Sequence, residues 1–201
     1  MSLIQIEGLT KKFGRRILFE NLNFSFSPGI YWLKGKNGQG KSTLLDIVAG
    51  MDRNITGKIK VNRQKMLYLT NHPIGLFPYT VSENLAILFK TFKLKLSGGQ
   101  EEILHNFLGN SFSDPYSVLS TGQRMKLGLS LVLVSEWDII LLDETLSTVD
   151  TTSRAIICKR LDHLAISKGT IVIYVSHGEV SRTLTKSSTV ISIKEKGLVY
   201  E

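Results

Sequence analysis

The N-terminal part of the chain alternates apolar and polar positions. The pattern covers the segments 3–9 and Ile17–Phe26, and Lys58–Val61 repeats it later. A period of two is typical of β-strands, and a polar face that stays in water is typical of antiparallel sheets. We therefore expect antiparallel strands here, with the lysines of Lys58–Val61 on the solvated face.

After this region, short apolar runs alternate with segments of helical spacing. The expected strands are Ile30–Leu33, Ile139–Asp143, Thr170–Val175 and a C-terminal pair, and the expected helices are Lys41–Ala49, Gln123–Val134 and Thr152–Ile166. The inner strands are apolar throughout, which favours a largely parallel sheet covered by helices. The fold class predicted is therefore α/β.

Residues 81–118 have a different texture from the rest of the chain. Val81–Phe92 and Glu101–Leu108 have helical spacing and lie between loop-like segments. We interpret them as a helical insertion that forms, with the following helix, a helical subdomain over about residues 81–135. The whole chain, 1–201, is predicted to be a single domain.

Composition narrows the class of protein. The 201 residues are 42% hydrophobic and 21% charged, as in globular proteins. No apolar run approaches the roughly 18 residues of a membrane helix, and no signal peptide is apparent. The one cysteine, Cys158, excludes an internal disulfide and favours a reducing cytoplasm. We expect Cys158 and Trp137 to serve core packing.

The net charge of +8 suggests an anionic partner at first sight. Residues 1–100 carry 15 basic and 5 acidic residues, so the excess lies in this half. The basic clusters at 11–16 and 90–95 lack the interleaved aromatic residues of a single-strand nucleic-acid track. We therefore expect both clusters to be solvated surface, and no nucleic-acid partner.

The first motif with a chemical meaning is Gly35-Lys36-Asn37-Gly38-Gln39-Gly40-Lys41-Ser42, which matches G-x-x-x-x-G-K-S. It lies between an apolar strand and an apolar helix, which is the context of a phosphate-binding loop. Backbone N–H groups and the helix N-terminus would hold a polyphosphate. Lys41 would reach the β- and γ-phosphates, and Ser42 would ligate Mg²⁺.

Two further strands end in polar residues. Asp143 and Glu144 end the apolar strand Ile139–Asp143, and His177 follows the strand at 170–175. The carboxyl ends of parallel strands share one edge of a sheet, where ligands bind. We expect Asp143 to hold Mg²⁺ through water and Glu144 to polarise the attacking water.

In combination and order, these motifs resemble those of the ATP-binding cassette (ABC) ATPase family. The resemblance implies a P-loop NTPase core that binds ATP and Mg²⁺. It also implies that Phe13 stacks on adenine, that Thr43 joins the phosphate loop, and that His177 is the switch histidine. Ser147-Thr148-Val149-Asp150 matches the D-loop of the family and places Asp150 beside the nucleotide.

The family signature, L-S-G-G-Q, has two candidates in this chain. Residues 96–100 match literally, whereas Leu119-Ser120-Thr121-Gly122-Gln123 departs at one position. We favour the second, because it is followed by Arg124 and Lys126 and by a long apolar helix that runs toward Asp143. The spacing from Ser120 to Asp143 is 23 residues, as the family pattern expects. Glu101 and Glu102 after the first candidate would repel a phosphate, so we interpret 96–100 as a coincidental loop.

The Q-loop of the family also has an altered counterpart. The segment 67–85 matches it, with Asn71 at the glutamine position, or His72 if the register shifts by one residue. Asn71 would contact Mg²⁺ or the attacking water on a shorter arm than glutamine. Thr145 replaces the proline that is usual after the catalytic glutamate, a change expected to alter local rigidity.

The resemblance implies an ATP-hydrolysing subunit of a transporter, similar to small exporter-type subunits. Two such chains, in a homodimer or heterodimer, would sandwich two ATP between Gly35–Thr43 of one and Ser120–Gln123 of the other. Separate transmembrane permease subunits would place the protein on the cytoplasmic face of the membrane. The positive charge of the protein is compatible with the anionic lipids there. The alternatives are a soluble ABC ATPase, such as the iron–sulfur assembly type, and a non-hydrolysing scaffold, which the intact Lys41 and Glu144 argue against.

Overall fold

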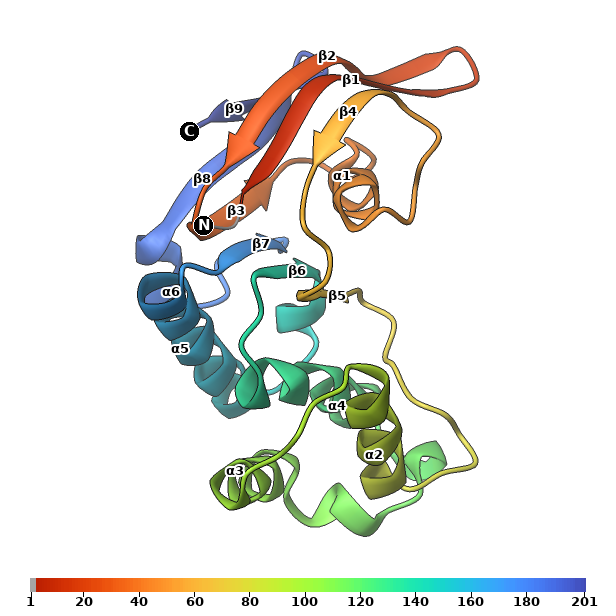
Figure 1. Ribbon diagram of the computed structural model, residues 1–201, viewed down its shortest axis with the longest axis vertical. Helices are drawn as coiled ribbons and strands as arrows, with labels where there is room; N and C mark the ends of the chain where they lie inside the picture. The colour runs from red at the N-terminus through yellow and green to blue at the C-terminus, as the bar shows by residue number, and fades with distance from the viewer. Residues whose placement is uncertain (1–2) are drawn as a thin grey trace.

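The computed structural model describes residues 3–201 as two β-sheets with helices packed on them (Figure 1). The strands are β1 (Ile4–Phe13), β2 (Arg16–Phe26), β3 (Gly29–Lys34), β4 (Thr56–Lys60), β5 (Met66–Leu69), β6 (Ile139–Asp143), β7 (Ile171–Val175), β8 (Ser188–Lys194) and β9 (Gly197–Tyr200). The α-helices are α1 (Lys41–Ala49), α2 (Val81–Thr91), α3 (Gly98–Leu108), α4 (Thr121–Val134), α5 (Thr151–Lys168) and α6 (Arg182–Ser187). Three short 3₁₀ turns join them: η1 (Gly109–Ser113), η2 (Tyr116–Val118) and η3 (Thr145–Ser147).

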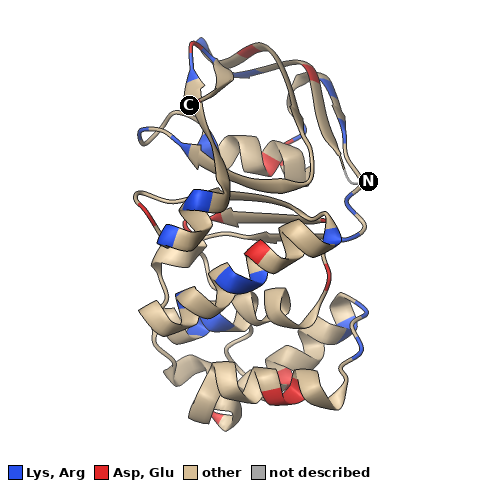
Figure 2. Cartoon of the chain, turned by 90° about the vertical axis from the view of Figure 1, so that its left-hand side faces the viewer, with Lys and Arg blue, Asp and Glu red and all other residues tan. Residues whose placement is uncertain are grey.

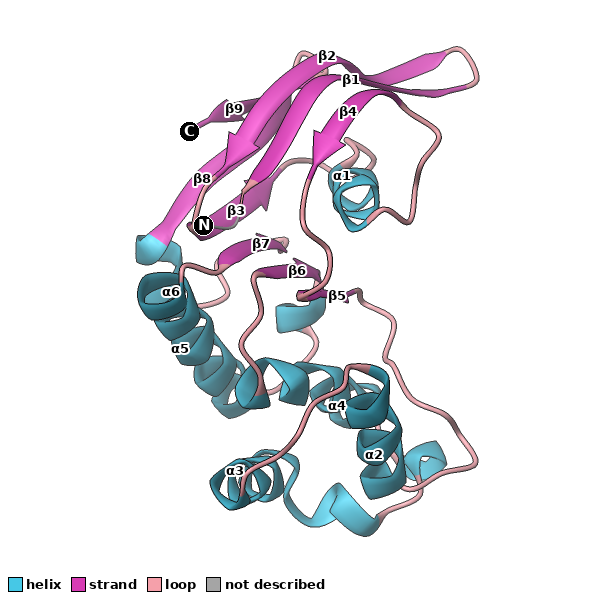
Figure 3. Cartoon of the chain, in the orientation of Figure 1, coloured by secondary structure: helices cyan, strands magenta, loops and turns pink. Residues whose placement is uncertain are grey.

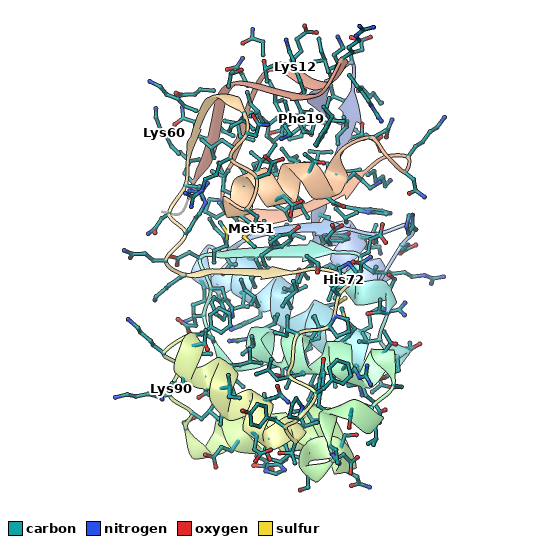
Figure 4. The ribbon with its side chains drawn as sticks, turned by 90° about the vertical axis from the view of Figure 1, so that its right-hand side faces the viewer. Lys12, Phe19, Met51, Lys60, His72 and Lys90 are labelled. Carbon is teal, nitrogen blue, oxygen red and sulfur yellow. The ribbon has the colours of Figure 1, made fainter. Side chains whose placement is uncertain are left out.

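The N-terminal sheet is antiparallel, with the strand order β2-β1-β4 (Figure 3). Its apolar side faces α1, and Phe19 is fully buried between them, whereas Lys12 and Lys60 are exposed at the surface (Figure 4). Gly57 has a φ of +93° where β4 meets β1, and a Cβ there would lie 2.5 Å from the carbonyl oxygen of Gly8. Only glycine fits this crossing of two backbones.

The second sheet has the order β5-β6-β7-β3-β8-β9, and β9 alone is antiparallel to its neighbour among the described strands. The central strands β6 and β7 are buried along their whole length, which explains their unbroken apolar sequences. Asp143 pairs with Val175 at the carboxyl end of the sheet. The predicted α/β fold with a mostly parallel sheet is confirmed.

The core lies in two layers, one on each face of the second sheet. One cluster fills the space between the two sheets and α1, and the other packs the opposite face against α4 and α5. Cys158 and Trp137 lie in the latter cluster with 3% and 5% exposure, as expected. Burial raises the pKa of the Cys158 thiol to about 11.

Helices α2, α3 and the start of α4 gather at the end of the molecule opposite the N-terminal sheet (Figure 1). The helix α2 begins with a capping box in which Thr80 and Glu83 bond each other's backbone N–H groups. Within residues 3–201, no helix combines the length and the apolar character needed to cross a membrane.

Several sequence expectations were wrong in detail. The helix expected at Glu101 begins at Gly98, so residues 96–100 are a helix start rather than a loop. The strand β5 and the helix α6 were not anticipated. Lys11, expected in solvent, is 2% exposed because its ammonium pairs with Asp52 at 2.6 Å. In the view of Figure 2, the positions of lysine and arginine are scattered over several elements.

Candidate nucleotide-binding site

The glycine-rich loop leaves the carboxyl end of β3 and turns into α1. Gly40, with a φ of +101°, is the residue before the helix, and a Cβ there would lie 2.8 Å from the Leu18 side chain. The Lys41 ammonium donates to the carbonyl oxygens of Gly35 at 2.8 Å and Lys36 at 3.0 Å. The loop thus closes around a positive charge, as a phosphate-binding loop requires.

The N-terminus of α1 differs from those of α2, α4 and α5. No described side chain caps it, whereas Thr80, Ser120 and Asp150 accept hydrogen bonds from backbone N–H groups at the starts of α2, α4 and α5. The first N–H groups of a helix need acceptors, and together they carry a partial positive charge. The start of α1 is therefore suited to an anionic ligand.

A cavity of about 380 Å³ opens in front of this helix end. Phe13 lies at it with 53% of its surface exposed, so a planar face is available. The lining residues are Phe13, Arg16, Leu18, Asn37, Gly38, Gly40, Lys41, Ser42, Thr43 and Glu144. The structure thus brings Phe13, most of the phosphate loop and Glu144 together.

Arg16 is a member of this site that the sequence analysis missed. Its guanidinium donates from Nη2 to the carbonyl oxygen of Gly38 at 2.6 Å, and so ties the β1–β2 hairpin to the phosphate loop. Arg16 is exposed, as expected for the cluster 11–16, but this contact with the phosphate loop was not anticipated. The signal was weak, because a basic residue in a hairpin gives no sign of its partner 22 positions away.

Asp143 ends β6 beside this loop and is 8% exposed. Its Oδ1 atom is buried and has no hydrogen-bond partner among the described residues. Burial raises the pKa of Asp143 above its usual value, and the nearby charges of Glu144 and Asp46 raise it further, while the Ser42 hydroxyl and Lys41 oppose them. A buried carboxylate with a free oxygen beside a serine hydroxyl suits a hard cation such as Mg²⁺.

Glu144 is held in a specific pose at the same edge of the sheet. Its backbone adopts a left-handed conformation, with a φ of +55°, and its N–H donates to the carbonyl oxygen of Val175 at 3.1 Å. Its Oε1 atom lies 2.9 Å from Nε2 of His177. The structure therefore joins the carboxylate and the histidine that the sequence placed on separate strands.

Ser120 begins α4 with a capping box. Its Oγ atom accepts from the N–H of Gln123, and its own N–H donates to Oε1 of Gln123 at 2.9 Å. Ser120, Thr121 and Gln123 are exposed, whereas Gly122 lies against the D-loop, where a Cβ would be 3.1 Å from the carbonyl oxygen of Thr148. Ser97 and Gln100 form a comparable start of α3.

The basic residues that follow this signature bond within the chain. Arg124 donates to the carbonyl oxygens of Tyr116 and Ser117, and the Lys126 ammonium lies 3.0 Å from Oδ2 of Asp150. Asp150 also accepts from the N–H and the hydroxyl of Ser153, and these bonds, with Lys126, lower its pKa. Asp150 is thus a helix cap in this structure.

Asn71 and His72 are exposed after the end of β5 and are not among the described residues that line the cavity. Figure 4 shows the position of His72. The signature residues Ser120–Gln123 and Asp150 also lie outside its lining. The structure therefore assembles one part of the predicted site and leaves these residues on other parts of the surface.

A phosphate loop at the edge of a largely parallel sheet, beside a buried aspartate and a Glu–His pair, defines a P-loop nucleotide-binding protein. The chain belongs to the ABC transporter family, whose profile matches residues 19–147.

Curated relatives agree with this family, and a solved structure agrees with the fold. The Fe(3+) ions import ATP-binding protein FbpC of Brucella abortus (strain 2308) is 29% identical over 213 residues, covering 98% of this chain and 60% of the relative. The aliphatic sulfonates import ATP-binding protein SsuB 1 of Streptomyces avermitilis is 28% identical over 201 residues, covering 100% of this chain and 76% of the relative. A solved ATP binding subunit of an ABC transporter has a TM-score of 0.83 at 18% identity, over 99% of this chain and 89% of that one, and supports the fold.

The chain thus spans about 60% of the length of FbpC. Both named relatives are import proteins, which differs from the resemblance to small exporter-type subunits drawn from the sequence.

Proposed function

We propose that this chain is the ATP-binding and ATP-hydrolysing subunit of an ABC transporter, which drives translocation through separate transmembrane subunits. The observation that carries the proposal is the uncapped start of α1 around Lys41, next to the buried Asp143 and the Glu144–His177 pair. Phosphate binding and water activation both have residues of suitable chemistry at this edge of the sheet. The names of the relatives, ATP-binding proteins of import systems, support the same reading.

Binding of ATP rests on the loop and the cavity. The N–H groups of Gly38, Gly40 and the first turn of α1 would bind the phosphates, while Lys41 would turn from the loop carbonyls toward the β- and γ-phosphates. The exposed ring of Phe13 would stack on adenine.

Ser42 and Asp143 would hold Mg²⁺, and Asn71 would reach it or the attacking water when its loop moves toward the cavity. When bound, Mg²⁺ neutralises charge on the phosphate oxygens. The orphaned Oδ1 of Asp143 gives a reason for the fit, because a cation would supply the partner that this atom lacks.

Hydrolysis would depend on Glu144 and His177. The Glu144 carboxylate would orient a water molecule and accept its proton, as a general base does. His177 lies 2.9 Å from that carboxylate, so it fixes the direction of Glu144 and would contact the γ-phosphate from the same position. Glu144 and His177 follow the neighbouring strands β6 and β7, so these two side chains already lie together before nucleotide binds.

The exposed signature residues are the main support for a dimer. Ser120, Thr121 and Gln123 lie on the surface at the start of α4, which offers backbone N–H groups to an anion of a second subunit. We propose that two chains sandwich two ATP, each between Gly35–Thr43 of one subunit and Ser120–Gln123 of the other. Asp150 would then lie at the interface, where it braces the D-loop.

Docking to a permease would use the apolar surface between β5 and α2. Leu76, Phe77 and Tyr79 are 50%, 57% and 41% exposed, and Arg124 lies over the Phe77 ring. A group of exposed apolar side chains is typical of a protein-binding surface. This arrangement would place the chain at the cytoplasmic face of a membrane, whatever the direction of transport.

The test is the Glu144→Gln variant, with Glu101→Gln on the exposed surface of α3 as its control. Glu144→Gln should reduce ATP hydrolysis by about 100-fold or more, since it removes the base while leaving the binding residues intact. It should also accumulate as an ATP-bound dimer, measured by size-exclusion chromatography with light scattering. Rapid turnover without a dimer in Glu144→Gln would contradict the proposal, as would equal losses in both variants.

A further inference from the structure

Thr145 directly follows Glu144 in the chain, and its side chain is buried, with 1% exposure. Its hydroxyl lies 3.1 Å from the carbonyl oxygen of Leu69 and 3.3 Å from that of Asp143. A hydroxyl has one proton to donate, and a buried hydroxyl must place it on an acceptor inside the protein. The nearer acceptor belongs to a strand 76 residues away in the sequence.

The position of Leu69 gives this bond its meaning. The parallel pairing of β5 with β6 ends at Leu69 and Leu142, and after Leu69 the chain leaves the sheet toward Asn71. The Thr145 hydroxyl therefore adds one connection beyond the last backbone pair. It attaches the base of the segment 70–80 to the residue next to Glu144.

The same turn is attached on its other side as well. The N–H of Glu144 donates to the carbonyl oxygen of Val175 at the end of β7. The two bonds fix the turn after β6 between its neighbouring strands. On the β7 side this brings Glu144 to His177, and on the β5 side it brings Thr145 to the segment that carries Asn71.

The helix α4 packs against the hydrogen bond between Thr145 and Leu69. Gly128 approaches so closely that a Cβ there would lie 3.2 Å from the Leu69 side chain and 3.3 Å from that of Ile74. The void left between α4, Thr145 and residues 69–74 is about 10 Å³, at or below the space that one water molecule needs. The Leu69 carbonyl therefore bonds the hydroxyl in a dry environment, where a hydrogen bond is stronger than in water.

We propose that Thr145 is a positioning residue that fastens the Asn71 segment to the strand end carrying Asp143 and Glu144. The inference rests on the roles proposed above for Asn71 and Glu144. Proline, which the family usually has here, has no hydroxyl and stiffens the turn by its ring alone. In this chain the hydroxyl holds the start of the segment, at the Leu69 carbonyl, to the turn after β6, so that Asn71 moves toward the cavity from a fixed point.

The test compares Thr145→Val, which keeps the shape and removes the hydroxyl, with Thr145→Ser, which keeps the hydroxyl. Thr170→Val is a matched control. Thr170 is equally buried, and its hydroxyl donates to the carbonyl oxygen of Trp137 at 2.7 Å, at the start of β7 and so at the opposite edge of the sheet.

The first measurement is hydrogen–deuterium exchange of residues 70–80 without nucleotide. Thr145→Val should speed exchange in this segment by about 3- to 10-fold, as the loss of one internal hydrogen bond implies. Thr145→Ser should restore the wild-type rate to within about twofold, and Thr170→Val should leave the segment unchanged. Equal exchange in Thr145→Val and Thr170→Val would overturn the proposal, as would a serine that restores nothing.

The second measurement separates kcat from KM in steady-state ATP hydrolysis. Thr145→Val should lower kcat by about 3- to 10-fold with KM within about twofold, because nucleotide contacts remain and only the geometry of the reacting step loosens. In an Asn71→Ala background the same substitution should have no further effect on kcat, since it acts through Asn71. Full additivity of the two changes would contradict the proposal.

These outcomes are distinguishable from a failure of the proposed function. If the wild-type chain hydrolyses no ATP, the function is wrong, and the exchange experiment still decides whether Thr145 fastens the segment. If Glu144→Gln loses hydrolysis while Thr145→Val behaves as Thr170→Val does, the function stands and the fastening role fails.

Discussion

The burial of Asp143 lowers the stability of the folded chain at a residue that is suited to bind a cation. A carboxylate with a buried, unpartnered oxygen has a higher free energy in the folded chain than in water. Its raised pKa expresses the same cost. Because the folded-state pKa lies above the unfolded value, the cost is absent at pH values below the unfolded pKa and grows as the pH rises through the folded pKa.

We therefore expect Asp143→Asn to raise the melting temperature of the nucleotide-free chain at pH 7. The gain should be a few degrees, since about 1 kcal/mol corresponds to about 2–4 °C in a domain of this size. It should shrink as the pH is lowered toward 4, because the raised pKa means that the wild-type carboxyl binds its proton at a higher pH in the folded chain than in the unfolded chain. Calorimetry at both pH values, with Glu179→Gln as a surface control, measures the effect.

The same variant should lose the stabilisation that Mg²⁺ and ATP give to the wild type, because the cation ligand is gone. An Asp143→Asn chain that is less stable than the wild type at pH 7 would show that the carboxylate makes a favourable contact in the fold.

Among single residues, the sequence identified those whose role follows from their spacing in a motif. Asp143 ends β6, Glu144 follows it, and Lys41 begins α1 at the end of the phosphate loop, so a motif finds all three. Lys11 and Arg16 were missed because their partners, Asp52 and the Gly38 carbonyl, are 41 and 22 residues away. The default for an isolated basic residue is solvent, and the burial of Lys11 against Asp52 is an exception that only the folded chain shows.

At the scale of elements, one four-residue pattern serves two helices. Ser97–Gln100 and Ser120–Gln123 both form the start of a helix, with the glutamine side chain bonded to the serine N–H. The likeness to the family signature is thus partly a likeness between capping boxes. Position decides between them, since Gly122 lies against the D-loop, whereas Gln100 bonds the far end of α4 at Val134.

Alanine at each serine separates capping from nucleotide chemistry. Ser97→Ala and Ser120→Ala should each cost no more than about 2 kcal/mol of unfolding free energy, the upper range for the loss of a helix cap. Only Ser120→Ala should reduce ATP hydrolysis, by about tenfold or more, because in the proposed dimer Ser120 would lie against the ATP of the second subunit. Urea unfolding and steady-state hydrolysis measure the two effects, and a comparable loss of hydrolysis in Ser97→Ala would reverse the assignment.

Helices and strands were predictable where the hydrophobic pattern was long, or where a residue such as glycine marked the boundary. The helix α1 begins and ends where the phosphate loop and Gly50 indicated, and β6 was found to the residue. The strand β5 was missed because four residues give too little periodicity to distinguish a strand from a loop. The start of α3 was missed because Gly98 and Gly99 are poor helix formers, which the cap at Ser97 outweighs.

At the scale of the whole molecule, the alternation of strands and helices predicted a parallel sheet. It did not predict the order β5-β6-β7-β3-β8, because neighbours in the sheet are set by long-range packing rather than by local sequence. That order puts the ends of β3, β6 and β7 side by side and so assembles the phosphate loop, Asp143 and His177. The signature remains separate from them within one chain, which is the physical basis for expecting two.

Mixing two inactive variants tests this arrangement of two chains. Lys41→Ala removes the phosphate loop lysine and Ser120→Ala the signature serine, so each homodimer has two defective sites. In an equal mixture, about half of the dimers should be mixed, each with one site that is wild type on both sides, giving about a quarter of wild-type hydrolysis. A mixture no more active than its components would contradict the shared site.

The burial of Cys158 has a practical consequence for labelling this chain with fluorophores. A thiol with 3% exposure and a pKa of about 11 is almost entirely protonated at neutral pH and out of reach of maleimides. Cysteines introduced at exposed positions, such as Lys12 on β1 and Lys90 on α2, would therefore accept fluorophores against a silent background. The separation of the two ends of the molecule during the ATP cycle is then measurable by energy transfer, without first removing the native cysteine.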